Sequence, residues 1–216
     1  MSDQHFTEQE RDAVYRVIAE RRDMRHFVGG EVPPAILANL LEAAHQAPSV
    51  GLMQPWRFIR ITDRALRGKI QALVEEERLR TAQALGERND EFMRLKVEGI
   101  ADCAEVLVVA LMDGRETHVF GRRTLPEMDL ASMSCAIQNL WLAARAENLG
   151  MGWVSLFEPQ AMAQLLGMPT GSKPLGVLCL GPVAEFYSKP MLVQEGWAKT
   201  RPLSELLFNN QWGKHQ

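Results

Sequence analysis

The segment from Asp129 to Asn148 constrains the fold more than any other part of the sequence. It predicts a helix whose apolar side chains cover most of the circumference: Leu130, Met133, Ala136, Ile137, Leu140, Trp141 and Ala144. A helix that is apolar nearly all round is buried in a core or in a subunit interface. Asp129 is positioned to cap its first turn, and Gly150 to close its end. Other elements or a second subunit must therefore cover this helix on every side.

Four segments have the pattern of strands. Val106 to Met112 is a continuous apolar run, which is typical of a strand buried on both faces. The others run from Arg57 to Thr62, from Met151 to Phe157 and from Gly176 to Leu180. Ser155 lies within the third of these, where a buried hydroxyl most often bonds to the backbone.

Helical patterns surround these strands. Thr7 to Arg22 predicts a helix that begins with a capping box of Thr7 and Glu10. A second helix opens at Pro33-Pro34 and stops near Pro48. Residues 64–98 are charged and mostly helical around a break at Gly86–Asp90, which suits either a solvated hairpin or a lid. The remaining predictions are an irregular stretch at 115–128, a short helix at 159–166 closed by Gly167, an extended stretch at 187–196 and an apolar tail with helical spacing from Arg201.

The composition fits an ordinary globular protein and argues against several classes. The chain has 216 residues, of which 46% are hydrophobic and 24% charged, enough for one domain with a real core. Its net charge of −3 argues against a nucleic-acid binder. The three cysteines and five histidines show no disulfide or metal-ligand spacing. We see no secretory signal, membrane-spanning run, dinucleotide fingerprint or P-loop, and a reducing cytoplasm is the expected location.

Residues 21–25 carry a dense cluster of charge at the end of the first predicted helix. Arg21, Arg22 and Arg25 present planar paired donors, which suit a phosphate or a carboxylate. Asp23 would repel a phosphate, so it either pairs with an arginine or faces another part of a ligand. The more common alternative is a solvated helix end whose cations complement the helix dipole.

Residues 48–56 form the second informative stretch. Two prolines fix backbone angles, and Gly51 permits angles that other residues avoid. Such a stiff loop can present backbone N–H groups, the Ser49 hydroxyl and the Gln54 amide to a planar polar ligand. On chemistry alone it could equally be a connector with Trp56 as a core anchor.

Motifs along nearly the whole chain resemble the nitroreductase-type flavoprotein family. They are Arg21-Arg22-x-x-Arg25-x-Phe27, Ala47-Pro48-Ser49, Gln54-Pro55-Trp56, Gly152-Trp153, and Arg201-Pro202-Leu203 with Trp212. Asp23 departs from the usual oxidoreductase members of that family. Together with the stretches 43–56, 96–100, 138–147 and 152–155, it is similar to the branch that makes 5,6-dimethylbenzimidazole, the lower ligand of vitamin B12.

The resemblance implies an α+β fold, in which a mixed, mainly antiparallel sheet is flanked by helices in an intertwined homodimer. It implies one domain over residues 1–216, with a C-terminal extension from about residue 186 that packs on the partner subunit. FMN would bind at the dimer interface, its phosphate held by Arg21, Arg22, Arg25 and Arg201. The other implied FMN contacts are Asp23, Met24, Pro48, Ser49, Gly51, Gln54, Lys96, Gly152, Trp153 and Ser155.

The implied chemistry consumes reduced FMN as a substrate. O2 adds to the flavin, and its ring system is broken down to 5,6-dimethylbenzimidazole and D-erythrose 4-phosphate. Asp23 would be the base beside the ribityl arm, and Ser155 its polar helper. A separate flavin reductase could supply reduced FMN, and residues 64–98 would then form a lid over the pocket.

Two other functions remain open on the sequence. One is a conventional NAD(P)H-dependent FMN oxidoreductase acting on nitro compounds or quinones, which would hold yellow FMN firmly. The other is a non-catalytic flavin-binding or flavin-delivery protein, which would form no product from bound reduced FMN. None of the three functions calls for a nucleic acid, a membrane or a metal ion.

Overall fold

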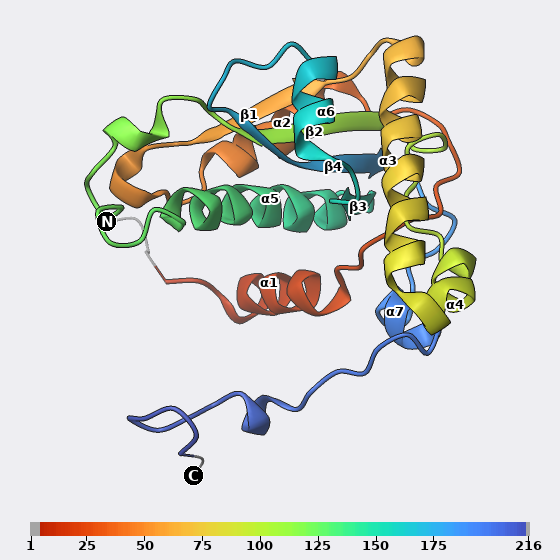
Figure 1. Cartoon of the computed structure of the whole chain (residues 1–216). Coiled ribbons are helices and arrows are strands. Elements are labelled where there is room, and N and C mark those ends of the chain that lie inside the picture. Colours follow the sequence, from red (N-terminus) through yellow and green to blue (C-terminus); the bar gives the residue numbers. More distant parts are fainter. Residues whose placement is uncertain (1–4, 215–216) are drawn as a thin grey trace.

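The structure, a computed structural model, describes residues 5–214 (Figure 1). Residues 1–4 of the polar N-terminal segment and residues 215–216, with His215, lie outside the described residues. The helices are α1 (Glu8–Glu20), α2 (Pro34–His45), α3 (Arg64–Ala84), α4 (Asn89–Arg94), α5 (Met128–Ala146), α6 (Pro159–Leu165) and α7 (Met191–Gln194). The strands are β1 (Trp56–Arg60), β2 (Glu105–Leu111), β3 (Gly150–Val154) and β4 (Lys173–Gly181).

The four strands form one sheet in the order β1-β2-β4-β3, and every pair of neighbours is antiparallel. The side chains of β2 alternate between two cores. Leu107 and Val109 belong to the cluster on the side of α2 and α5, whereas Val106 and Val108 belong to the cluster with α3 and α6. Burial on both faces accounts for the continuous apolar run and confirms the predicted central strand.

Helix α5 packs beside α2 against one face of this sheet (Figure 1). Met133, Ile137 and Leu140 are fully buried there, and the Asn139 amide donates to the carbonyl of Ala43 on α2 at 3.1 Å. The predicted buried helix is therefore confirmed, and so is the fold of helices flanking a mainly antiparallel sheet. Within residues 5–214, the parallel contribution is one isolated bridge between Asp23 and Met151.

The predictions for the two ends of α5 are wrong. Asp129 does not cap the helix; it lies inside the first turn and is buried, with Oδ2 accepting from Arg115 at 2.8 Å and from Arg122 at 2.9 Å. After the last turn the left-handed conformation falls on Asn148, and Gly150 is the first residue of β3. Both arginines lie within the irregular stretch at 115–128, so no local sequence pattern identified them as partners of Asp129.

Three further predictions need correction. Strand β3 ends at Val154, so Ser155 lies just past the strand and not within it. The stretch predicted to be extended contains the short helix α7. Within the described residues the tail contains one short turn at Leu203–Glu205, and its helical spacing does not produce a longer helix.

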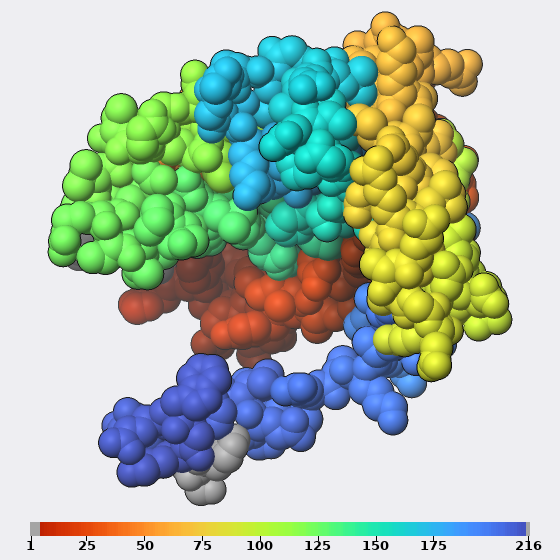
Figure 2. All heavy atoms as spheres, in the orientation of Figure 1, coloured from red at the N-terminus to blue at the C-terminus, as the bar shows by residue number. Residues whose placement is uncertain are grey.

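The N-terminal helix and the tail leave apolar side chains in solvent. No residue of α1 is buried, and Val14, Tyr15 and Ile18 are exposed on it. Leu203, Leu207 and Trp212 are exposed on the tail, and Trp212 reaches 92%. Figures 1 and 2 show the tail leaving the body of the protein and extending below α1. These surfaces fit the expectation that the tail packs on a second subunit, which stays a prediction.

The buried position of Asp129 predicts the cost of removing its carboxylate. Asp129→Ala leaves Arg122 buried without its counter-charge, and we expect it to lower the free energy of unfolding by about 3–5 kcal/mol. Asp63 is a true N-cap, because it accepts from the backbone N–H groups of Ala65 and Leu66, so the control Asp63→Ala should cost only about 0.5–2 kcal/mol. Urea denaturation measures both, and equal losses would show that Asp129 acts as a cap after all.

Candidate functional site

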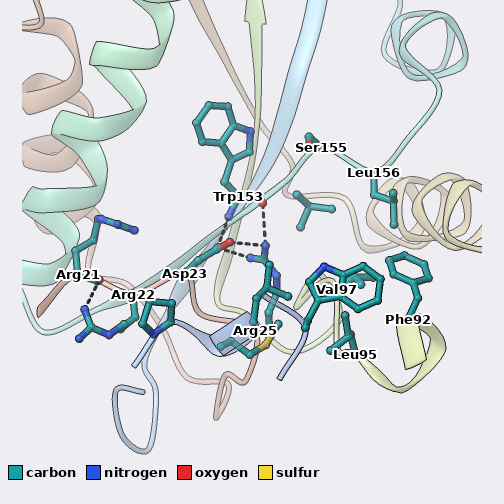
Figure 3. Close-up of a pocket in the computed structure, with 15 residues that line it drawn as sticks. Arg21, Arg22, Asp23, Arg25, Phe92, Leu95, Val97, Trp153, Ser155 and Leu156 are labelled. Carbon is teal, nitrogen blue, oxygen red and sulfur yellow. Dashed lines mark hydrogen bonds and ion pairs between the residues drawn. The ribbon is translucent and has the colours of Figure 1, made fainter. Parts of the chain in front are cut away.

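A cavity of about 380 Å³ opens between the end of β3, the segment after α1, and the helices α4 and α7. Its size falls within the roughly 300–1,000 Å³ of small-molecule sites. Figure 3 shows arginines and Asp23 on one side and apolar side chains on the other. The polar members are Arg21, Arg22, Asp23, Arg25 and Ser155; the apolar members are Phe92, Leu95, Val97, Trp153, Val154, Leu156, Pro190, Met191, Leu192 and Trp197.

Asp23 and Arg25 form the central polar pair of the cavity (Figure 3). Arg25 donates from Nη1 to Oδ1 of Asp23 at 2.5 Å and from Nη2 to Oδ2 at 2.7 Å. The pair is fixed to β3, because Trp153 donates its N–H to Asp23 Oδ1 at 3.0 Å and its carbonyl accepts from Arg25 Nη2 at 2.9 Å. The alternative in which Asp23 pairs with an arginine is therefore correct, and that arginine is Arg25.

The pKa of the Asp23 carboxyl is raised above its ordinary value, because burial away from solvent outweighs every opposing effect. The opposing effects are the charge of Arg25, the hydrogen bonds from Trp153 and Arg25, and the charge of Arg21. The Asp23 side chain keeps 43% of its surface exposed, and it lines the cavity. A carboxylate with a raised pKa that is open to a cavity is suited to accept a proton from a bound molecule.

Arg21 and Arg22 differ in how far their donors are already used. Arg22 donates to the carbonyl oxygens of Ala19 at 2.7 Å, Arg21 at 2.8 Å and Ser188 at 3.2 Å. The Arg21 guanidinium lies 4.5 Å from the centre of the Trp141 ring, and its side chain makes no hydrogen bond within residues 5–214. Arg21 therefore has the donors available for an anionic ligand.

Gly152, Trp153 and Ser155 reach the site from β3 and the residue that follows it. A side chain at Gly152 would collide with the Met24 carbonyl oxygen and with Nη1 of Arg25, so glycine is needed for the close approach of the two segments. Trp153 holds the Asp23–Arg25 pair through its backbone, and its ring packs edge-on against Trp141. Ser155 lines the cavity.

Three predicted FMN contacts do not point into the cavity. Met24 is fully buried, and its side chain belongs to the core cluster on the α3 side of the sheet. Lys96 pairs with Asp102 at 2.7 Å, although its neighbours on both sides line the cavity. Arg201 is exposed on the tail. The structure thus brings together Arg21, Arg22, Asp23, Arg25, Trp153 and Ser155, but not the side chains of Met24, Lys96 and Arg201.

The loop with Pro48, Ser49, Gly51 and Gln54 lies at the other end of α5. The Val50 N–H donates to the Ser132 hydroxyl in the first turns of that helix, at 3.0 Å. Arg21 instead stacks on Trp141, nine residues further along α5, or about 13 Å at 1.5 Å per residue. The Ser49 hydroxyl accepts from the Gln54 N–H at 3.0 Å, which keeps the loop tight. A single chain does not place this loop in the cavity.

The apolar side of the cavity was not predicted from the sequence. Phe92, Leu95 and Val97 come from the charged 64–98 segment, and Trp197 comes from the chain after α7. Apolar residues clustered at 92–97 within so charged a segment were a usable signal of a buried surface.

Over residues 5–214, no helix is long and apolar enough to cross a membrane, and no group of three acidic, histidine or cysteine side chains could hold a metal ion.

Known sequences that are similar to this chain indicate its family. A sequence model of the nitroreductase family matches residues 18–182. A 5,6-dimethylbenzimidazole synthase from Rhodospirillum rubrum is 39% identical over 196 residues, which are 89% of this chain and 92% of that protein. A protein of the same name from Rhodobacter capsulatus is 37% identical over 201 residues, or 92% of this chain and 97% of that one.

Solved structures show the same fold at low sequence identity. Nitroreductase A from Vibrio parahaemolyticus has a TM-score of 0.70 at 20% identity, covering 94% of this chain and 78% of its own. A BluB-like flavoprotein from Clostridium difficile has a TM-score of 0.69 at 17% identity, covering 92% and 99%. Iodotyrosine deiodinase bound to FMN and 3-iodo-L-tyrosine has a TM-score of 0.66 at 22% identity, covering 82% and 92%.

The close approach at Gly152 predicts that even a methyl group will not fit there. Gly152→Ala pushes Met24 and Arg25 away from β3, and we expect a loss of about 1–3 kcal/mol in the free energy of unfolding. Gly68 lies in the second turn of α3 with open space around it, so Gly68→Ala should instead stabilise the protein by about 0.5–1 kcal/mol. Urea denaturation compares them; a Gly152→Ala variant as stable as the wild type would contradict the packing described.

Proposed function

The chain belongs to the nitroreductase family, and we propose that it is a 5,6-dimethylbenzimidazole synthase that consumes reduced FMN and O2. Identities of 39% and 37% to two proteins of that name, over about nine tenths of the chain, support the activity. The structural observation that carries the chemistry is a single carboxylate, Asp23, open to a cavity and set among arginines.

The residues of the cavity fit a flavin mononucleotide. Arg21 has unused donors for a phosphate, and Phe92, Leu95 and Trp197 offer an apolar surface for a planar ring system. Bound reduced FMN supplies the reactivity toward O2 and the carbon skeleton of the benzimidazole, while the protein binds and orients it. D-erythrose 4-phosphate leaves as the second product.

Asp23 is the proposed base of this reaction. The ribityl arm of FMN has five carbons and D-erythrose 4-phosphate has four, so C1′ stays with the benzimidazole and the C1′–C2′ bond is the one that breaks. Asp23 would accept a proton from the arm close to C1′. The raised pKa of the Asp23 carboxyl makes its ionised form a stronger proton acceptor. Ser155, which also lines the cavity, offers a hydroxyl that can donate to one polar atom and accept from another.

We also propose that the complete site contains residues from two copies of the chain. Ser49, Gly51 and Gln54 are held away from the cavity of their own chain by the length of α5. The exposed apolar residues of α1 and of the tail provide surface for a homodimer. In that dimer, the loop at 48–54 and Arg201 of one copy reach the cavity of the other. Lys96 would reach the ligand by leaving its ion pair with Asp102.

Removing the charge of Asp23 tests its role as the base. Asp23→Asn should keep the Kd for FMN within about threefold but slow 5,6-dimethylbenzimidazole formation by about 10²–10⁴. Chemically reduced FMN is mixed with enzyme in air, and the product is followed by mass spectrometry. Asp113→Asn, at an exposed site away from the cavity, is the matched control and should keep wild-type turnover. Near-normal turnover by Asp23→Asn would exclude Asp23 as the base.

A mixed dimer tests whether two copies build each site. Asp23→Asn disables a cavity, and Gly51→Val distorts the loop, because Gly51 has a φ of +53°. If each site takes its cavity from one copy and its loop from the other, a dimer of the two variants holds one intact site and should have about half of wild-type activity. Differently tagged chains are co-expressed and purified as mixed dimers. Mixed dimers as inactive as both parent variants would contradict the shared site.

A further inference from the structure

We infer that Arg25 is the positioning residue of Asp23 and not a ligand of the FMN phosphate, an inference that rests on the proposed function. The family resemblance assigns Arg25 to the phosphate together with Arg21 and Arg22. The geometry of the three guanidinium groups separates their roles.

The hydrogen-bond capacity of Arg25 is almost used up within the protein. Nη1 donates to Asp23 Oδ1 and, at 3.3 Å, to the Met24 carbonyl; Nη2 donates to Asp23 Oδ2 and to the Trp153 carbonyl. Four of its five N–H groups are thus engaged, and the side chain is only 9% exposed. A phosphate could take these donors only by separating Arg25 from Asp23, which would leave a carboxylate beside the phosphate.

The backbone on both sides of this pair is fixed as well. The Met24 N–H donates to the Met151 carbonyl at 2.9 Å, where the two segments form their parallel bridge. The Arg25 N–H donates to the Tyr187 hydroxyl at 3.2 Å, and that hydroxyl is 2.6 Å from Nδ1 of His26. Tyr187 follows the residues matched by the nitroreductase sequence model, which end at 182. The segment after β4 therefore supports the backbone of Arg25 from beyond the residues that the nitroreductase sequence model matches.

The same contacts indicate which oxygen of Asp23 takes the proton. Oδ1 accepts from both Arg25 and the Trp153 N–H, whereas Oδ2 accepts from Arg25 alone among residues 5–214. A carboxylate oxygen has two lone pairs, so Oδ2 keeps the capacity to accept from one further donor, and Asp23 lines the cavity. Arg25 thereby holds the carboxylate in one orientation and leaves a defined acceptor site.

Loss of Arg25 has a predictable effect on the pH dependence. The charged and polar groups that face Asp23 are Arg25, Arg21 and the Trp153 N–H, and all of them favour the ionised carboxylate. Removing the Arg25 charge therefore raises the pKa of Asp23 further. Because the base must be unprotonated, the acid limb of the rate profile should move to higher pH.

The experiment compares Arg25→Gln with Arg21→Gln in the full-length protein, using FMN binding and product formation as separate readouts. Arg25→Gln should change the Kd for FMN by less than about threefold, lower kcat at least about tenfold, and move the acid limb to higher pH. Arg21→Gln should raise the Kd for FMN about tenfold or more and largely keep kcat at saturating flavin. If Arg25→Gln weakens FMN binding as much as Arg21→Gln, with kcat and the acid limb unchanged, the inference is overturned.

A second variant decides the matter if Arg25→Gln does not fold. Tyr187→Phe removes the acceptor of the Arg25 N–H without changing any charge, and it should lower kcat several-fold at an unchanged Kd for FMN. A wild-type kcat in Tyr187→Phe would show that the Tyr187 hydroxyl does not hold Arg25 in position. The wild-type reaction is run in parallel: absence of benzimidazole there would refute the proposed function, whereas the FMN affinities would still separate a phosphate ligand from a positioning residue.

Discussion

The pairing of the segment after α1 with the edge strand β3 is the interaction on which the site depends. One parallel bridge, between Asp23 and Met151, places the carboxylate beside Trp153, and Trp153 then binds both members of the Asp23–Arg25 pair through its backbone. The close approach requires glycine at position 152. Because the sheet is buried on both faces, this edge is rigid, and a site built on it holds its groups more firmly than a site on loops alone.

Burial explains why the central elements could be predicted from the sequence. The continuous apolar run of β2 and the almost wholly apolar α5 have few alternatives to the middle of a core, and the structure places both there. The capping box at Thr7 and Glu10 is likewise a local pattern with a local consequence, and it is present as predicted. The arginines near Asp23 line the same cavity, and the pairing of Asp23 with Arg25 joins residues only two positions apart, so a local pattern could predict it.

Contacts between distant segments explain what the sequence could not supply. Asp129 has the sequence position of a helix cap, but in the structure it forms buried ion pairs with Arg115 and Arg122. The different roles proposed for Arg21 and Arg25 depend on contacts with residues more than a hundred positions away. Arg21 stacks on Trp141, and Arg25 donates to the carbonyl of Trp153. The loop at 48–54 was predicted to contact FMN, yet its own chain keeps it at the opposite end of α5, so its proposed role requires a second copy.

The most direct test of the central claim, that this chain breaks FMN down, is a mass balance on the flavin. Purified protein is incubated in air with FMN, a flavin reductase and NADH, and mass spectrometry quantifies both FMN and 5,6-dimethylbenzimidazole. The proposed activity predicts that benzimidazole appears in an amount equal to the FMN lost. Intact FMN, with continuing consumption of NADH and O2, would contradict it and would point to a conventional FMN oxidoreductase on the same fold.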